Sequence, residues 1–168
     1  GLEDVSAVGV SDLNDAEECA GARNIALRSL AARARSEAEI RQQLADRGVA
    51  PGLIDRVVGD LIDQRLVDDW QLATDLAHTL QEGKKMGPAA VRQALVKRRI
   101  SRVIIDEVTA GLNPVESETL EELARSRMRV LGGLDREVQV RRLVGYLARR
   151  GYQGSEVDRA IDRVVNQV

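Results

Sequence analysis

Basic side chains are concentrated in one stretch of the sequence that contains no acid. Residues 84–105 include seven Lys or Arg residues and neither Asp nor Glu. Cations without neighbouring acids are the residue types that contact phosphate groups or an acidic protein surface. A second set of arginines lies between residues 141 and 150. The candidate residues for binding DNA or a partner protein are therefore Lys84, Lys85, Arg92, Lys97, Arg99, Arg102, Arg141, Arg142, Arg149 and Arg150.

The same cations also have a structural interpretation, which the sequence leaves open. Lys and Arg near the C-terminal end of a helix complement its partial negative charge, and a row of cations can simply face water. Arg98 differs from its neighbours because it recurs as Arg47 and Arg150 in an internal repeat. We predict that Arg98 stabilises its own repeat by reaching carbonyl groups at the end of its helix.

Residues that could carry catalysis or hold a metal are isolated from one another in the sequence. Cys19 is the single cysteine and His78 the single histidine, so neither has a partner of its own kind for a metal motif. The acidic pair Asp68-Asp69 precedes a predicted helix, where carboxylates act as caps. No glycine-rich segment has the spacing of a phosphate-binding loop. We predict a protein that is not an enzyme and has no catalytic residue, cofactor or metal.

The elements that position these side chains are repeated along the chain. The segment 39–58 returns as 90–109, and a weaker third copy follows at 147–161. The first two copies share seven identical positions, namely Arg41/Arg92, Gln42/Gln93, Leu44/Leu95, Arg47/Arg98, Ile54/Ile105, Asp55/Asp106 and Val57/Val108. A fixed period of roughly 50 residues is typical of a repeat protein.

Capping and stop signals predict three helices in each copy. Ser36 and Glu39 form a capping box, Gly48 suits a left-handed stop, and Pro51 suits the first turn of the next helix. The prediction is an all-α fold of three tandem three-helix repeats, with about nine helices in a curved, extended array. The predicted repeats span residues 21–66, 67–113 and 114–168.

The composition indicates an aliphatic core and no membrane span. The chain has 43% hydrophobic residues but no Phe, one Trp and two Tyr. Trp70 falls on a predicted apolar helix face, so we expect it in the core. No apolar run approaches the 18 residues of a membrane-spanning helix, and the single cysteine forms no disulfide within one chain. We expect a cytoplasmic monomer without a membrane partner.

The first 20 residues have a different composition from the rest. They contain six Asp or Glu residues, no Lys or Arg, and no apolar periodicity. We expect residues 1–20 to form an acidic arm without regular structure, and the first helix to begin near Ala22.

Three segments are similar to those of a known family, the RecX proteins. They are Leu66–Ala73 with its Leu-Val-Asp-Asp start, Lys84–Leu95 with its Gly-Pro step, and Arg35–Leu44. Their order and spacing, with the repeat, extend the resemblance over residues 22–165. Two positions depart from the family pattern: Leu72 stands where Phe is usual, and Arg99 where Gly is usual.

The resemblance implies a regulator of RecA recombinase without catalytic activity. Such a protein is expected to bind the RecA filament, touching protein and DNA, and to inhibit its ATPase, strand exchange and coprotease activities in homologous recombination and the SOS response. DNA contacts would be to the phosphate backbone of single or double strands, without sequence specificity. The alternative is a helix-turn-helix type of nucleic-acid-binding module that acts without RecA.

Overall fold

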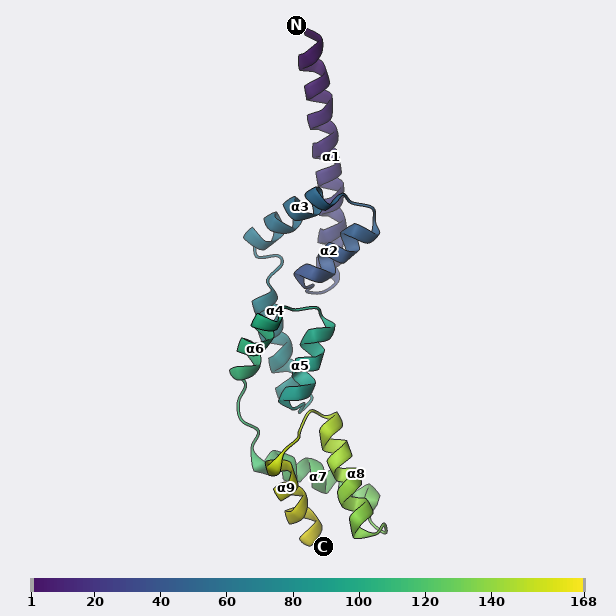
Figure 1. The fold of residues 1–168 in the computed structure, drawn as a ribbon, viewed down its shortest axis with the longest axis vertical. Coiled ribbons are helices and arrows are strands. Elements are labelled where there is room, and N and C mark those ends of the chain that lie inside the picture. The colour runs from purple at the N-terminus through teal and green to yellow at the C-terminus, as the bar shows by residue number, and fades with distance from the viewer. Residues whose placement is uncertain (1, 168) are drawn as a thin grey trace. The chain divides into compact units, whose positions relative to one another are not determined.

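The residues that the structure describes form nine α-helices and one π-helical turn, with no strand. The computed structural model describes residues 2–167, with side chains from residue 12 onward (Figure 1). The elements are α1 (Leu2–Ala32), α2 (Glu37–Asp46), α3 (Pro51–Asp63), α4 (Asp69–His78), η1 (Thr79–Gly83), α5 (Pro88–Lys97), α6 (Arg102–Ala110), α7 (Ser117–Leu131), α8 (Arg136–Arg149) and α9 (Ser155–Asn166). The prediction of an all-α fold with three tandem three-helix repeats is confirmed.

Repeat 1 consists of α1, α2 and α3, whose termini follow the predicted signals. Ser36 accepts a hydrogen bond from the Glu39 amide, and the Glu39 carboxylate accepts one from the Ser36 amide, which completes the capping box. Gly48 adopts a φ of 79° after α2, and Pro51 occupies the first turn of α3. The core of this repeat is aliphatic and consists of Ala22, Ala26, Ile40, Leu44, Ile54, Val57, Val58, Leu61 and Val67.

Repeat 2 consists of α4 to α6 and contains the π-helical turn η1. Pro88 opens α5, and Ser101 caps α6 by accepting from the Ile104 amide. The π-helical turn follows α4 and buries Leu80, and no signal in the sequence predicts it. Repeat 2 buries Val91, Leu95 and Ile105 at the positions that the repeat alignment assigns to its core.

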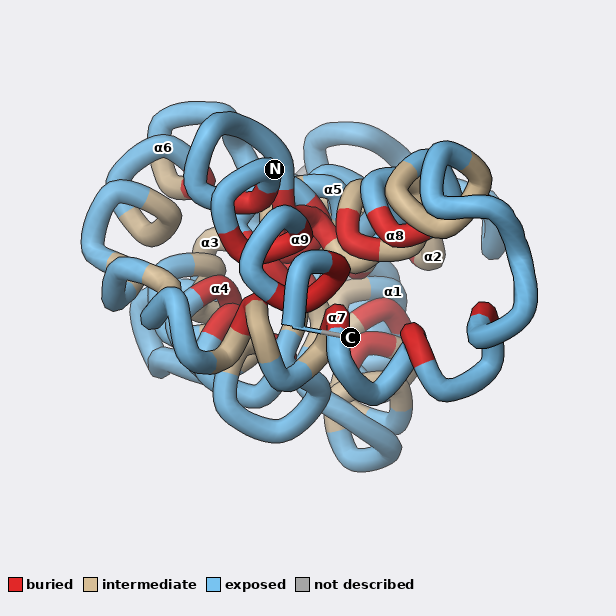
Figure 2. Tube along the Cα trace, turned by 90° about the horizontal axis from the view of Figure 1, so that it is seen from below, coloured by how far each residue is buried: buried red, intermediate tan, exposed pale blue. Residues whose placement is uncertain are grey.

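Repeat 3 consists of α7, α8 and α9 and has the largest of the buried clusters. Its core contains Leu120, Ala124, Met128, Leu131, Leu143, Leu147, Tyr152, Val157, Ala160, Ile161, Val164 and Val165. Figure 2 shows buried and exposed stretches alternating along the helices, because each helix turns one face to a core. Helix α8 has 14 residues, whereas α2 and α5 have ten each.

The contacts within the chain divide it into two compact units. Unit 1 contains the residues up to Leu72 together with Arg98–Ile100, and unit 2 contains Ala73–Lys97 and Ser101 onward. The three residues Arg98–Ile100 therefore pack with repeat 1, although they follow α5 of repeat 2 in the chain. This short turn is a junction between consecutive repeats.

Helix α1 differs from the expected acidic arm. It begins at Leu2 rather than near Ala22, and it continues without interruption to Ala32. The missing apolar periodicity indicates a lack of burial, not a lack of helix, and residues 12–18 of α1 are all exposed. No proline interrupts this segment, and acidic residues near a helix N-terminus complement the dipole. The side chains of Glu3 and Asp4 lie outside the described residues.

Trp70 is the other correction to the expected core. Its side chain is 45% exposed, whereas Ala73 and Ala77 on the same helix are fully buried. The face of α4 that packs inwards is therefore built on small residues, and the indole lies at its edge.

Candidate functional site

The candidate cations divide into two groups by burial. Arg92 and Arg150 are half-buried, which indicates that their side chains are engaged within the protein. The other eight candidates are exposed, namely Lys84, Lys85, Lys97, Arg99, Arg102, Arg141, Arg142 and Arg149.

Arg92 is held by an ion pair inside repeat 2. Its guanidinium binds the Asp106 carboxylate and donates to Thr109 Oγ1 at 3.4 Å. The same pair occurs in repeat 1, where Arg41 donates to Asp55 at 2.6 Å. That hydrogen bond raises the pKa of Arg41. An Arg–Asp pair that joins the second and third helices in both repeats is structural, so Arg92 is a weak candidate for binding a partner.

Arg150 lies at a junction between repeats 2 and 3, within unit 2. It donates to the Lys84 carbonyl at 2.7 Å, and its own carbonyl accepts from the Gly87 amide at 2.6 Å. Tyr152 donates to the Lys85 carbonyl at 2.5 Å. Burial raises the pKa of Tyr152, and the nearby Arg150 charge lowers it in part. The backbone carbonyls of Lys84 and Lys85 thus accept the hydrogen bonds of this junction, while both lysine side chains remain exposed.

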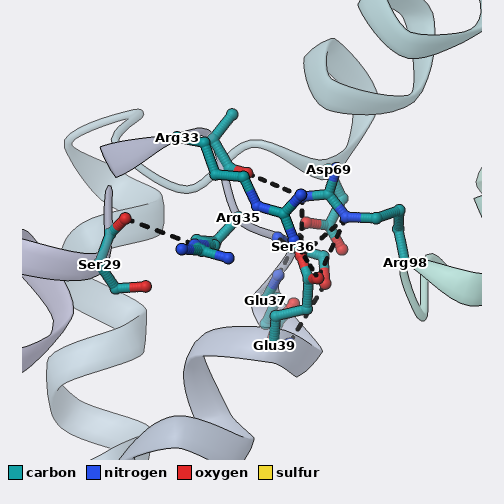
Figure 3. Close-up of polar contacts among 9 residues, drawn as sticks. Ser29, Arg33, Arg35, Ser36, Glu37, Glu39, Asp69 and Arg98 are labelled. Atoms are coloured by element: carbon teal, nitrogen blue, oxygen red, sulfur yellow. Dashed lines mark hydrogen bonds and ion pairs between the residues drawn. The ribbon is translucent and has the colours of Figure 1, made fainter. Parts of the chain in front are cut away.

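Arg98 forms the corresponding junction in unit 1 (Figure 3). Its guanidinium donates to the Glu39 carboxylate at 2.9 Å and to the Ala34 carbonyl at 2.8 Å. The side chains of Arg98 and Glu39 are only 17% and 18% exposed. Arg98 therefore has a structural role, as predicted, but the carbonyl that it reaches belongs to the preceding repeat rather than to its own helix.

The electrostatics of this junction favour the charged form of Glu39. Burial acts to raise the pKa of Glu39, but the hydrogen bonds from Arg98 and Ser36 and the charge of Arg98 together lower it. Asp69 adds a further link by accepting from the Glu37 amide at 2.9 Å. Burial raises the pKa of Asp69, although the Glu37 amide opposes this.

Three exposed cations have an unusual backbone conformation. Within residues 2–167, positive φ angles at non-glycine residues occur at Arg65 (59°), Lys85 (53°) and Arg99 (56°). Each of them closely follows a helix end, where glycine is the favoured residue. A side chain in this conformation costs about 1 kcal/mol relative to glycine. We call these three residues the left-handed cations.

The left-handed cations combine backbone strain with exposure, and such a combination supports the hypothesis of a functional role. Arg65 is 84% exposed and forms a weak contact with Asp68 at 3.5 Å, while Arg99 lies 3.4 Å from Gln42. Lys85 and Arg99 are among the cations predicted from the sequence, whereas Arg65 is not, because it lies outside the acid-free stretch. The signal that would have found Arg65 is a basic residue at the position of a helix-terminating glycine.

Replacing Arg99 by Gly is expected to stabilise the protein and to weaken polyanion binding. Glycine removes a strain of about 1 kcal/mol, so the thermal midpoint should rise by a few degrees. The binding of single-stranded DNA, measured by fluorescence anisotropy, should weaken, because the predicted phosphate-binding surface loses one cation. Unchanged DNA affinity in a stabilised variant would show that the Arg99 cation has only a helix-capping role.

Known protein families and solved structures share this architecture. Family models of the RecX first, second and third three-helix domains match residues 22–61, 68–108 and 115–161. The regulatory protein RecX of Mycolicibacterium smegmatis is 35% identical over 139 residues, which cover 80% of this chain and 74% of that protein. The chain belongs to the RecX family.

Further relatives agree with the RecX assignment. The regulatory protein RecX of Mycobacterium leprae is 36% identical over 148 residues, which cover 86% of this chain and 85% of that protein. A crystal structure of RecX from Lactobacillus salivarius superposes with a TM-score of 0.80 and covers 91% of this chain and 99% of that one. At 19% identity, the likeness to that crystal structure supports the RecX fold alone. The resemblance seen in the three sequence segments is confirmed.

The two residues with catalytic potential lie on different helices of this RecX-family structure. Cys19 is half-buried on α1, and His78 is exposed at the end of α4. Among the described side chains no group of three or more His, Cys, Asp or Glu residues could hold a metal ion. In the same part of the chain no helix is long and apolar enough to cross a membrane.

Proposed function

We propose that this chain is a non-catalytic regulator of RecA recombinase, which binds the nucleoprotein filament and inhibits its ATPase, strand exchange and coprotease activities. Membership of a family of regulatory proteins supports this role. The observation that carries it for this chain is the set of exposed cations, including the three left-handed cations, which the fold itself does not require.

The proposed DNA contact is electrostatic. Lys97 has no side-chain partner in the described part of the chain, and the Arg102 contact with Asp106, at 3.8 Å with an 87% exposed guanidinium, is weak. Both lie near Arg99 in sequence, at the end of α5 and the start of α6. Exposed, weakly paired cations of this kind bind phosphates without reading bases. The exposed Arg141, Arg142 and Arg149 of α8 are proposed as a second set of contacts.

Reversing three charges tests the proposal. The variant Lys97→Glu, Arg99→Glu, Arg102→Glu should keep its fold, because these side chains are exposed, and should inhibit the DNA-dependent ATPase of RecA less than the parent does. In a plot of the logarithm of the DNA-binding constant against the logarithm of the salt concentration, the steepness of the slope should fall by roughly 0.7–0.9 for each phosphate group that the variant no longer binds.

The matched control reverses Arg28, Arg56 and Arg159, which are exposed and lie away from the acid-free stretch. Both variants undergo the same change in net charge. If the two triple variants behave alike, the effect comes from net charge and the proposed surface is wrong. If the parent binds DNA tightly but does not affect RecA, the alternative of a DNA-binding module acting without RecA is favoured.

A further inference from the structure

The two junctions described above use the same turn at the same place in the repeat. The turn follows the second helix and consists of Arg98-Arg99-Ile100 in repeat 2 and Arg150-Gly151-Tyr152 in repeat 3. In each case the arginine donates to a carbonyl in the loop before the second helix of the preceding repeat (Figure 3 for Arg98). The third residue of the turn is 5% exposed in both.

Repeat 1 contains this turn as well, as Arg47-Gly48-Val49. Its backbone has the same form: the Val49 amide donates to the Leu44 carbonyl at 3.0 Å, as Tyr152 donates to Leu147 at 2.9 Å. The glycine has a positive φ of 79° here and 92° at Gly151. The turn is therefore already in the conformation that docks elsewhere in the chain.

The surroundings of the turn in repeat 1 are open. Arg47 is exposed, and its side chain has no hydrogen-bond or ion-pair partner among the residues with described side chains. A Cβ added at Gly48 would meet nothing within 4 Å, whereas one added at Gly151 would lie 2.5 Å from the Ala90 nitrogen. Val49 is half-buried, while Ile100 is buried. The docking turn is present, but its acceptor is absent from the described chain.

A second copy of this chain is a poor acceptor, because repeat 3 lacks the receiving loop. When the repeats are aligned so that Leu147 matches Leu44, helix α8 begins one turn earlier than α2. The residue that corresponds to Ala34 is then Glu137, which lies inside α8. Its carbonyl bonds within α8 and is not available to another chain. In addition, the exposed Arg142 stands at the position of Glu39 and would repel Arg47.

We propose that the Arg47-Gly48-Val49 turn is a docking site for a partner protein that presents loop carbonyls followed by an acid-bearing first helical turn. The Ala34–Glu39 segment, which receives Arg98, is the internal example of this chemistry. The proposal rests on the proposed function in one respect, because it takes the recombinase filament as the partner. It differs from the DNA surface in the group recognised, which is a protein loop and carboxylate rather than phosphate.

The test compares Arg47→Glu with Arg56→Glu, which reverses another exposed arginine in the same repeat. The probe is RecA assembled on poly(dT), with binding of the full chain followed by sedimentation or anisotropy. Arg47→Glu should weaken filament binding about tenfold or more, because a central charge that pairs with the partner is reversed. Arg56→Glu should bind like the parent. The affinity of both variants for naked poly(dT) should change equally, and their thermal midpoints should stay close to the parent.

Each outcome decides the proposal. Filament binding by Arg47→Glu that equals that of Arg56→Glu overturns the docking site while leaving the proposed function intact. A loss of naked-DNA affinity confined to Arg47→Glu also overturns it, since Arg47 would then be a phosphate contact. A parent chain that fails to bind the filament overturns the proposed function and this inference together.

Discussion

Replacing Gly151 by Ala should destabilise the protein by about 2–4 kcal/mol, far more than a surface substitution does. Two effects combine at this position. The φ of 92° disfavours any side chain, and the new Cβ would lie 2.5 Å from the backbone nitrogen of Ala90 and 2.8 Å from the carbonyl oxygen of Gly87. Backbone atoms at the start of α5 cannot move away as a flexible side chain can. The expected result is a loosened junction between repeats 2 and 3.

The matched control is Gly48→Ala, which makes the same change in the same turn of repeat 1. There the φ is 79° and a Cβ meets nothing within 4 Å, so only the conformational cost of about 1–2 kcal/mol remains. Chemical denaturation of both variants measures the difference. The Gly87 amide, which donates to the Arg150 carbonyl, should also exchange with solvent faster in Gly151→Ala. Equal destabilisation by the two substitutions would contradict the tight packing at this junction.

Local signals in the sequence were sufficient to predict most of the helices. The Ser36–Glu39 capping box, Pro51 and Pro88 each act within a single turn, so their effect does not depend on the rest of the fold. The internal repeat then extends the helix assignment of one copy to the other two copies. The start of α1 was missed because hydrophobic periodicity detects helices that are buried on one side, and residues 12–18 of α1 are exposed throughout.

The candidate site was harder to predict, because the sequence does not show which cations are already paired. Arg92 and Arg99 have the same charge and lie in the same acid-free stretch, yet Arg92 pairs with Asp106, which lies 14 residues away. The partner of Arg98 lies 59 residues away, in another repeat. Asp69 similarly accepts from the Glu37 amide in repeat 1, while Asp68 accepts from the Gln71 amide in the helix that it precedes. Contacts across a junction depend on how the repeats stack, which no local pattern specifies.

The second large effect is expected at the junction in unit 1. Replacing Arg98 by Gln should destabilise the protein by about 2–3 kcal/mol, because it leaves the mostly buried Glu39 carboxylate with only a weak ion pair to the exposed Arg33 at 3.9 Å. Both side chains are less than one-fifth exposed, so water can compensate only in part. The control is Arg41→Gln, which removes a more exposed pair with Asp55 and should cost less than about 1 kcal/mol. Equal losses from the two substitutions would mean that burial adds nothing to the Arg98–Glu39 pair.

The pH dependence of stability separates this ion pair from simple packing. Because the pKa of Glu39 is lower in the folded protein than in the unfolded chain, its contribution to stability is fully present above the unfolded pKa of about 4.3. That contribution is lost as the pH falls through the folded pKa, where the carboxyl becomes protonated in both states. The difference in unfolding free energy between the parent and Arg98→Gln should therefore be constant near pH 7 and should shrink below about pH 4.

A second variant isolates the charge of Glu39. In a Glu39→Gln background, which keeps the acceptor for the Ser36 amide, Arg98→Gln should lower the free energy of unfolding by only about 1 kcal/mol at any pH. A loss that stays the same at pH 7 and pH 3 would show that Arg98 acts through packing and its bond to the Ala34 carbonyl, and not through the charge of Glu39.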